Sequence, residues 1–327
     1  IGLKLGLEFC RHVGIVPPTH NEWEHGHMVS TRKALAALTL TGLGALAYAH
    51  LETKRFTLRR IEVPILPPDQ DSLRVLHISD LHMVPGQKTK SEWLQSLAAL
   101  SPDAVVATGD FLSHVEGISS ALEALNPLMD LPGAFVLGSN DYYAPKPINP
   151  IRYFSGPSQL TPSRPMLDWE PLVAGMTAQG WHDLTNAQVD WKVAGRLISV
   201  KGVDDPHISR DDYSGITHSF NADADLTLGV VHAPYLRVLD AMAADNAQLI
   251  LAGHTHGGQL RVPGYGALVT NCDLDPKQAR GLSHHRSSAL HVSAGLGCSQ
   301  YAPFRFACPP EATLITLKSR SSHLKWS

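Results

Sequence analysis

The chain has 327 residues, of which 43% are hydrophobic and 17% are charged, so it can bury a sizeable core and wholesale disorder is excluded. Its 27 basic and 30 acidic residues give a formal net charge of −3, which argues against a general nucleic-acid-binding protein. Four cysteines are too few for a disulfide scaffold. The 18 histidines are the unusual feature, and their positions are the first guide to function because imidazole ligates metals.

The N-terminal part of the chain predicts a membrane or export segment. Residues 1–33 are expected to form a solvated tail or a leader. Residues 34–51 form an uncharged run that would extend for about 27 Å as a helix, close to the ~30 Å hydrocarbon core of a bilayer. A signal peptide, a membrane anchor and a buried helix are the three interpretations. The anchor is favoured because no good cleavage site is evident.

The charges around this run do not decide which side of the membrane the rest of the chain occupies. Two basic residues, Arg32 and Lys33, precede it, and four follow it: Lys54, Arg55, Arg59 and Arg60. Basic residues favour the cytoplasmic side, whereas a secretion signal would place the same residues outside. Residues 52–72 contain the Pro-rich stretch IEVPILPPDQ and predict a linker into the following domain.

From residue 73 to residue 327 the pattern predicts one α/β domain, because short apolar runs alternate with segments of helical periodicity. Helices are expected around residues 93–100, 118–129 and 236–243. Strands are expected at residues 73–78, 104–108, 134–137, 197–203, 226–231, 249–252, 290–293 and 312–317. Residues 141–170 interrupt this alternation with prolines and aromatic residues. They predict an ordered lid, with a packed surface loop as the alternative.

Side chains that can ligate a metal follow five of the expected strands. In chain order they are Asp80 with His82, Asp110, the segment Gly138-Ser139-Asn140-Asp141, His232, and His254 with His256. Ligands bind at the carboxyl ends of strands in α/β sheets, so we expect these groups to converge. Carboxylate plus imidazole ligation suits Mn, Fe, Zn or Co better than Ca or Mg. Two cations about 3.5–4 Å apart need a bridging carboxylate, and Asp110 is the natural candidate.

The ordered set resembles the signature of the calcineurin-like metallophosphoesterases, in which D-x-H is followed by G-D, G-N-H-D, an isolated histidine and G-H-x-H. The matching residues are Asp80-Leu81-His82, Gly109-Asp110, Gly138-Ser139-Asn140-Asp141, His232 and Gly253-His254-Thr255-His256. The run GHTHGGQL at residues 253–260 is similar to a branch with an N-terminal membrane segment or signal. Some members of that branch cleave phosphodiester or pyrophosphate bonds in lipid-like substrates.

This resemblance implies a four-layer αββα sandwich with two divalent metal ions, which would be manganese, iron or zinc. One ion would be held by Asp80, His82, Asp110 and His256. The other would be held by Asp110, His232, His254 and an amide, for which Asn140 is preferred. The implied reaction is hydrolysis of a phosphoester by a hydroxide that bridges the two ions.

The segment Gly138–Asp141 departs from the family pattern, because G-S-N-D replaces G-N-H-D. Without a gap, Ser139 takes the ligand position and Asn140 takes the position of the catalytic histidine. A local shift of one residue would let Asn140 reach the metal, and an amide oxygen is a better neutral ligand than a hydroxyl. The histidine that assists the leaving group is missing, and His114 is the candidate substitute. An activated diester or a pyrophosphate tolerates this loss best.

Candidate substrate contacts are Arg261, Arg305 and Tyr142, and Arg280 and Arg286 are further candidates for binding phosphate. A phosphomonoesterase or protein phosphatase is the nearest alternative function. A non-catalytic, membrane-associated protein that binds a phosphate headgroup is the alternative from another class. No nucleic-acid partner is expected. Cys298 and Cys308 could form a disulfide in an oxidising compartment or remain buried thiols.

Overall fold

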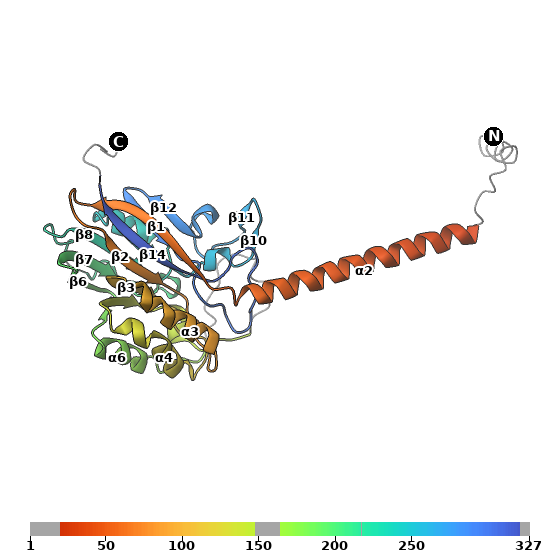
Figure 1. Ribbon diagram of the computed structural model, residues 1–327, viewed down its shortest axis with the longest axis horizontal. Helices are drawn as coiled ribbons and strands as arrows, with labels where there is room; N and C mark the ends of the chain where they lie inside the picture. The colour runs from red at the N-terminus through yellow and green to blue at the C-terminus, as the bar shows by residue number, and fades with distance from the viewer. Residues whose placement is uncertain (1–19, 148–163, 217, 321–327) are drawn as a thin grey trace. The chain divides into compact units, whose positions relative to one another are not determined.

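The computed structural model describes residues 20–147, 164–216 and 218–320, and side chains are described from residue 33 onward (Figure 1). The chain divides into two compact units, residues 1–48 and residues 49–327. Helix α2 (His20–Glu52) begins in the first unit. Residues 20–33 therefore belong to a helix, residues 1–19 lie outside the described residues, and the expectation of a tail or a leader stays a prediction. The segment Lys33–Glu52 is long and apolar enough to cross a membrane.

The second unit contains two six-stranded mixed sheets. The first has the order β1 (Thr57–Leu66), β14 (Glu311–Ser319), β2 (Leu73–Ile78), β3 (Ala104–Thr108), β4 (Gly133–Val136) and β5 (His182–Asp183). The second has the order β12 (Gly281–His285), β13 (Ser288–Val292), β9 (Leu249–Ala252), β8 (Leu226–Val231), β7 (Arg196–Gly202) and β6 (Ala187–Val193). Strands β2 to β5 are parallel, and so are β7, β8, β9 and β13.

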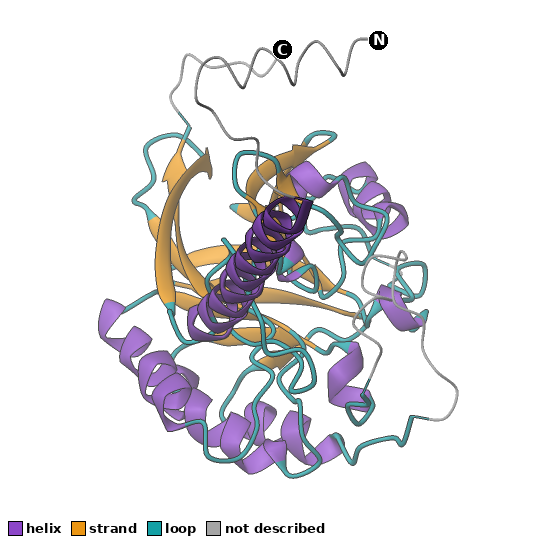
Figure 2. Ribbon diagram, turned by 90° about the vertical axis from the view of Figure 1, so that its right-hand side faces the viewer, coloured by secondary structure: helices purple, strands orange, loops and turns teal. Residues whose placement is uncertain are grey.

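The two sheets pack against each other through an apolar core. Val75 and Val106 of the first sheet belong to the same buried cluster as Leu228 and Leu251 of the second. Alternate residues on each strand point outward, where helices cover them. Helices α3 (Lys88–Ser96), α4 (Gly117–Met129) and α6 (Glu170–Ala178) pack on the outer face of the first sheet, and α7 (Leu236–Ala244) packs on the second. The result is a four-layer αββα sandwich (Figure 2).

The expected linker at residues 52–72 contains β1, which pairs in parallel with β14 from Thr57 opposite Glu311 to Leu66 opposite Ser319. The expectation of a linker is wrong for this stretch, because Val63, Ile65 and Leu66 are buried in the core between the sheets. Prolines such as Pro64 are typical of connecting segments and so predict a linker. Proline is tolerated here because β1 is the edge strand and needs no complete ladder of hydrogen bonds.

The other differences lie at the edges of the sheets and in the connections. The sequence did not predict strands β5, β6 and β12, or the hairpin of β10 (Arg261–Val262) with β11 (Gly266–Ala267). It also did not predict helix α6 and the short helix α5 (Ser139–Tyr142). Within the described residues, 3-10 helices occur at Pro206–Ile208, His256–Gly258 and Pro276–Gln278, and a further one, Leu97–Leu100, continues α3. Most of the expected lid lies outside the described residues.

The core between the sheets predicts a large cost for shortening an inner side chain. We expect Leu251→Ala to lower the free energy of unfolding by about 2–5 kcal/mol, because Leu251 is fully buried and a cavity would remain. Urea unfolding followed by tryptophan fluorescence measures this loss. Leu282→Ala is the matched control, because Leu282 lies on the edge strand β12 and is 40% exposed. Equal losses in both variants would contradict the assignment of the core.

Candidate metal centre

The carboxyl ends of strands from both sheets supply the polar side chains of the candidate site. Asp80 and His82 follow β2, Asp110 follows β3, and Asn140 lies in α5 directly after β4. The second sheet contributes three histidines, which are His232 after β8 and His254 and His256 after β9. All of the ligand candidates except Asn140 and His256 are fully or almost fully buried.

Asp110 is the carboxylate that the two halves of this site share. Its Oδ2 atom lies 3.5 Å from Nε2 of His82 and 3.5 Å from Nε2 of His232. On one side, Nε2 of His256 lies 3.3 Å from Nε2 of His82 and 3.7 Å from Oδ1 of Asp80. On the other side, Nδ1 of His254 lies 3.3 Å from Nε2 of His232.

The backbone takes an unusual conformation at these positions. Asp80, His82, Asp110, His254 and His256 have φ values between 45° and 68°, in the left-handed region that side chains other than glycine rarely adopt. Each such residue costs of order 1–3 kcal/mol and persists where the surrounding structure holds it. A glycine next to Asp110 is also required, because a Cβ atom on Gly109 would lie 2.9 Å from Nδ1 of His232.

Asn140 also contacts Asp110. Its backbone N–H donates to Oδ1 of Asp110 at 2.9 Å, and its side-chain Nδ2 donates to Oδ2 at 2.7 Å. The Asn140 Oδ1 atom accepts a hydrogen bond from Nη2 of Arg164 at 3.1 Å. In this arrangement the amide nitrogen faces Asp110, so ligation through the amide oxygen requires the amide to turn over.

Burial and charge set the protonation of the site. Burial lowers the pKa of His82 to about 4, and it also lowers the pKa values of His254 and His256 well below the ordinary range. Burial disfavours the ionised form of Asp110, but the charge of His232 outweighs this and lowers the pKa of the carboxyl. Burial likewise opposes the charge on His232, whose pKa is nevertheless raised to about 10 by Asp110 and other carboxylates.

These groups fit divalent cations. Nε2 of His82 faces Nε2 of His256. The lone pairs of two such nitrogens repel each other unless a proton or a cation lies between them. One ligand atom from each of Asp80, His82, Asp110 and His256 lies within 4.8 Å of the others. Neutral imidazole and ionised carboxylate are the forms that bind borderline divalent metals.

Tyr142 and Arg305 do not fit their expected roles as substrate contacts. Tyr142 is fully buried, and its hydroxyl donates to Oδ1 of Asp204 at 2.9 Å. The buried guanidinium of Arg305 donates to the carbonyl groups of Ala294 and Gly297, and it lies 3.3 Å from Nδ1 of His256. Arg305 therefore supports the loop around the site, and neither side chain is presented to a substrate.

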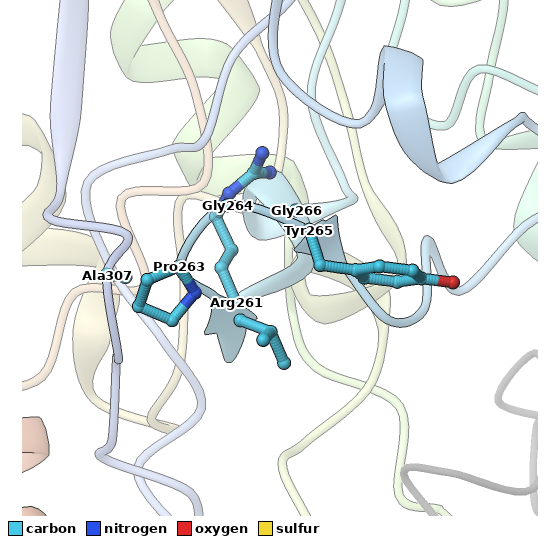
Figure 3. Close-up of a pocket in the computed structure, with 7 residues that line it drawn as sticks. Arg261, Pro263, Gly264, Tyr265, Gly266 and Ala307 are labelled. Atoms are coloured by element: carbon cyan, nitrogen blue, oxygen red, sulfur yellow. The ribbon is translucent and has the colours of Figure 1, made fainter.

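The other expected contacts lie outside the cluster. Arg261 donates to the carbonyl of Gly257 at 2.7 Å and lines a surface pocket with Pro263 and Tyr265 (Figure 3). Arg280 lies 3.7 Å from Glu311, and Arg286 pairs with Asp240 on the surface at 2.6 Å. His114 is half-buried, and its Nδ1 accepts the backbone N–H of Glu116 at 3.1 Å.

Several residues around the site were missed in the sequence. Asp141 accepts backbone N–H groups from Asp110, Leu112 and Gly138, which ties the loops after β3 and β4 together. Asp205 is fully buried, and burial raises its pKa to about 7. The ring of His207 lies 4.6 Å from that of His254. The segment Asp204-Asp205-Pro206-His207 follows β7, so the rule that ligands follow strands could have found it.

The structure contains no disulfide between Cys298 and Cys308. Cys298 and Cys308 are free thiols. The Cys308 thiol is fully buried and donates to the carbonyl of His256 at 3.3 Å. It therefore belongs to the packing behind the site.

The arrangement agrees with comparisons to known proteins. Residues 73–258 match the calcineurin-like phosphoesterase family. The chain belongs to that family. This phosphoesterase is 26% identical over 304 residues to an uncharacterized metallophosphoesterase of Bacillus subtilis, YkuE, covering 88% of this chain and 94% of the relative.

Two further relatives of this phosphoesterase have descriptive names. The UDP-2,3-diacylglucosamine pyrophosphatase LpxG of Chlamydia muridarum is 25% identical, covering 89% of this chain and 97% of the relative. A transmembrane protein with a metallophosphoesterase domain from Bos taurus is 26% identical, covering 89% of this chain and 63% of the relative.

Changing Ser139 and Asn140 separately tests which of them is a ligand. We expect Asn140→Ala to lower metal affinity by about 10–100-fold, because the side-chain hydrogen bond from Nδ2 to Asp110 is lost together with the candidate ligand, while the backbone N–H remains. Ser139→Ala is the matched neighbouring control and should retain metal. Mass spectrometry of the metal content after gel filtration measures both. Loss of metal in Ser139→Ala alone would reverse the assignment.

The protonation of His232 predicts how metal binding depends on pH. The carboxylates raise the pKa of His232 to about 10, so a metal must displace a proton at neutral pH. We expect the affinity for the metal to rise as the pH is raised from about 6 to about 9. Metal binding should release roughly one proton from His232. Calorimetry in buffers of different ionisation enthalpy counts the protons. An affinity that does not change with pH would contradict a ligand role for His232.

Proposed function

We propose that this phosphoesterase hydrolyses a phosphodiester or pyrophosphate bond with two divalent cations that share Asp110. The observation that carries the proposal is the equal distance of 3.5 Å from Oδ2 of Asp110 to His82 and to His232, which belong to different sheets. A carboxylate flanked in this way is suited to bridge two ions. The comparisons support the phosphoesterase class, and the number and identity of the ions are part of this proposal.

In this proposal Asp80, His82, Asp110 and His256 hold one cation, and Asp110, His232, His254 and Asn140 hold the other. The bound cations would activate water for attack and polarise the phosphorus oxygens. The low pKa of Asp110 keeps its carboxylate ionised throughout. Asn140 and Arg164 lie beside Asp110, and the guanidinium of Arg164 would stabilise negative charge on the leaving group.

The proposed substrate is amphipathic and has a good leaving group. The segment Gly138–Asp141 lacks the histidine that protonates the leaving group in the family pattern, so a phosphate leaving group is favoured over an alkoxide. The relative LpxG is named as a pyrophosphatase of a diacylated sugar nucleotide, which supports a lipid-like substrate.

We also place the protein at a membrane. Helix α2 contains the apolar segment Lys33–Glu52, whose side chains are almost all exposed. A relative from Bos taurus is named as a transmembrane protein. An uncleaved anchor formed by this segment would hold the phosphoesterase unit at the membrane surface.

Replacing the shared carboxylate tests the mechanism. We expect Asp110→Asn to lower turnover of bis(4-nitrophenyl) phosphate by more than about 100-fold and to reduce metal content, because a neutral amide cannot bridge two cations. Manganese, iron and zinc are tested separately. Asp240→Asn is the matched control, because Asp240 is a surface carboxylate with a 42% exposed side chain.

The outcomes separate the rival functions. Full activity in Asp110→Asn would exclude the proposed mechanism. Turnover of 4-nitrophenyl phosphate in preference to the diester would identify a monoesterase. Metal binding without turnover of any phosphoester, in the unchanged chain, would identify a binding protein.

A further inference from the structure

Five large apolar side chains are exposed on two segments, which are the β10–β11 hairpin with the residue after it and the loop at residues 299–307. We call this set the apolar rim, and it consists of Val262, Tyr265, Leu268, Tyr301 and Phe304. Their exposed fractions range from 36% for Phe304 to 76% for Tyr265. Figure 3 shows the ring of Tyr265 extending away from Pro263 and Ala307. Side chains of this kind are rarely left together in water unless they meet a partner or a membrane.

Hydrogen bonds hold the two segments that carry the apolar rim together. The side chain of Gln259 donates to the carbonyl groups of Ala302 and Phe304 at 3.0 and 2.9 Å. The backbone N–H of Arg261, at the start of the β10–β11 hairpin, donates to the carbonyl of Phe306 at 2.9 Å. The hairpin and the loop at residues 299–307 therefore lie side by side, with Leu260 bridged to Phe306.

The same loop packs against the end of helix α2. The backbone N–H of Arg305 donates to the carbonyl of Ala49 at 2.9 Å, and the ring of His50 lies 6.4 Å from that of Phe304. Nδ1 of His50 lies 3.3 Å from the carbonyl of Pro303. Residues 49–52 belong to the phosphoesterase unit, so these contacts do not depend on the direction of the preceding helix.

We propose that the apolar rim docks into the lipid surface from which helix α2 emerges. This inference rests on the membrane anchor of the proposed function. If residues 33–52 cross a bilayer, the last turn of the helix lies at the interface between lipid and water, and the loop that contacts this turn must lie there too. Tyr and Trp are typical of this interface because their rings combine an apolar face with a polar group.

The charges beside the apolar rim match this occupant. Lys54 and Arg55 are exposed and follow the end of the helix directly. Basic side chains at this position attract anionic lipid headgroups. A second protein would also cover apolar side chains, but the covalent continuity with an apolar helix and the adjacent basic pair favour lipid.

Docking in this manner would bring the metal centre to the membrane surface. Arg305 lies in the loop of the apolar rim, and its guanidinium contacts His256 and the carbonyl groups of Gly295 and Gly297. The backbone N–H of Gly297 in turn donates to the carbonyl of Asp80. The substrate class is therefore an amphipathic phosphoester whose acyl chains stay in the bilayer while its phosphate reaches the cations.

The test uses the full chain in vesicles of phosphatidylcholine and phosphatidylglycerol. Tyr265→Cys is labelled with the environment-sensitive fluorophore NBD. Ala194→Cys is the matched control, because Ala194 is exposed in the turn that precedes β7, whereas the candidate ligands follow the carboxyl ends of the parallel strands β8 and β9. The unsubstituted chain, labelled in the same way, gives the background from native cysteines.

We expect the label at position 265 to emit at shorter wavelength and to be quenched by doxyl-labelled lipids severalfold more strongly than the label at position 194. Quenching of position 265 by aqueous iodide on vesicles that carry the protein would overturn the inference. Protection from iodide without quenching by doxyl lipid would assign the surface to a protein partner and would also overturn it. Failure of the chain to float with vesicles would overturn the anchor and the docking together.

Activity separates this inference from the proposed chemistry. The double variant Tyr265→Ser with Phe304→Ser should lose turnover of a pyrophosphate lipid embedded in vesicles and should keep turnover of soluble bis(4-nitrophenyl) phosphate. Equal turnover of the vesicle substrate by both proteins would overturn docking and leave the chemistry intact. If the unsubstituted chain does not hydrolyse soluble bis(4-nitrophenyl) phosphate, the proposed function is refuted instead.

Discussion

Asp110 holds its position only while two separate sheets remain packed against each other. Its neighbour His82 lies at the end of the first sheet and its neighbour His232 at the end of the second, so no single layer contains the site. Burying an ionised carboxylate costs several kcal/mol unless charges and hydrogen bonds compensate. Asn140 supplies two of these hydrogen bonds, and the imidazole of His232 supplies the facing charge. The apolar core holds the two sheets together, and the polar centre at its edge therefore forms only when this core is packed.

Hydrogen bonds between neighbouring loops support the strained backbone of the ligand residues. The backbone N–H of Asp80 donates to the carbonyl of Gly109, and that of His82 donates to the carbonyl of Asp110. The loop after β9 is tied in the same manner to the loop after β8, through Gly253 and His232. Each loop thus fixes its neighbour, and the left-handed residues have little freedom to relax. Such a framework keeps the ligand atoms in place before any cation binds.

Sequence reasoning located the inner strands and the ligand candidates for one physical reason. Inner strands are apolar on both faces and end abruptly where a polar group begins, and a sequence displays such boundaries. Edge strands such as β1 and β12 are half-exposed, so they lack this contrast. Arg305 and Tyr142 show the other limit, since a sequence does not reveal whether a guanidinium or a phenol is buried among carbonyl and carboxylate groups. Asp205 and His207 follow β7 but belong to no part of the family signature, so the motif does not point to them.

The parallel pairing of β1 with β14 has a consequence for biosynthesis. These two strands come from opposite ends of the phosphoesterase unit, and β14 also lies between β1 and β2. Among the described strands β14 is the last along the chain, so β1 and β2 each keep an open edge until residues 311–319 have been synthesised. Unpaired edges are prone to pair with other chains. Capture of the emerging apolar helix by a bilayer would keep nascent copies apart during that interval, and closure of the first sheet would be the last step of folding.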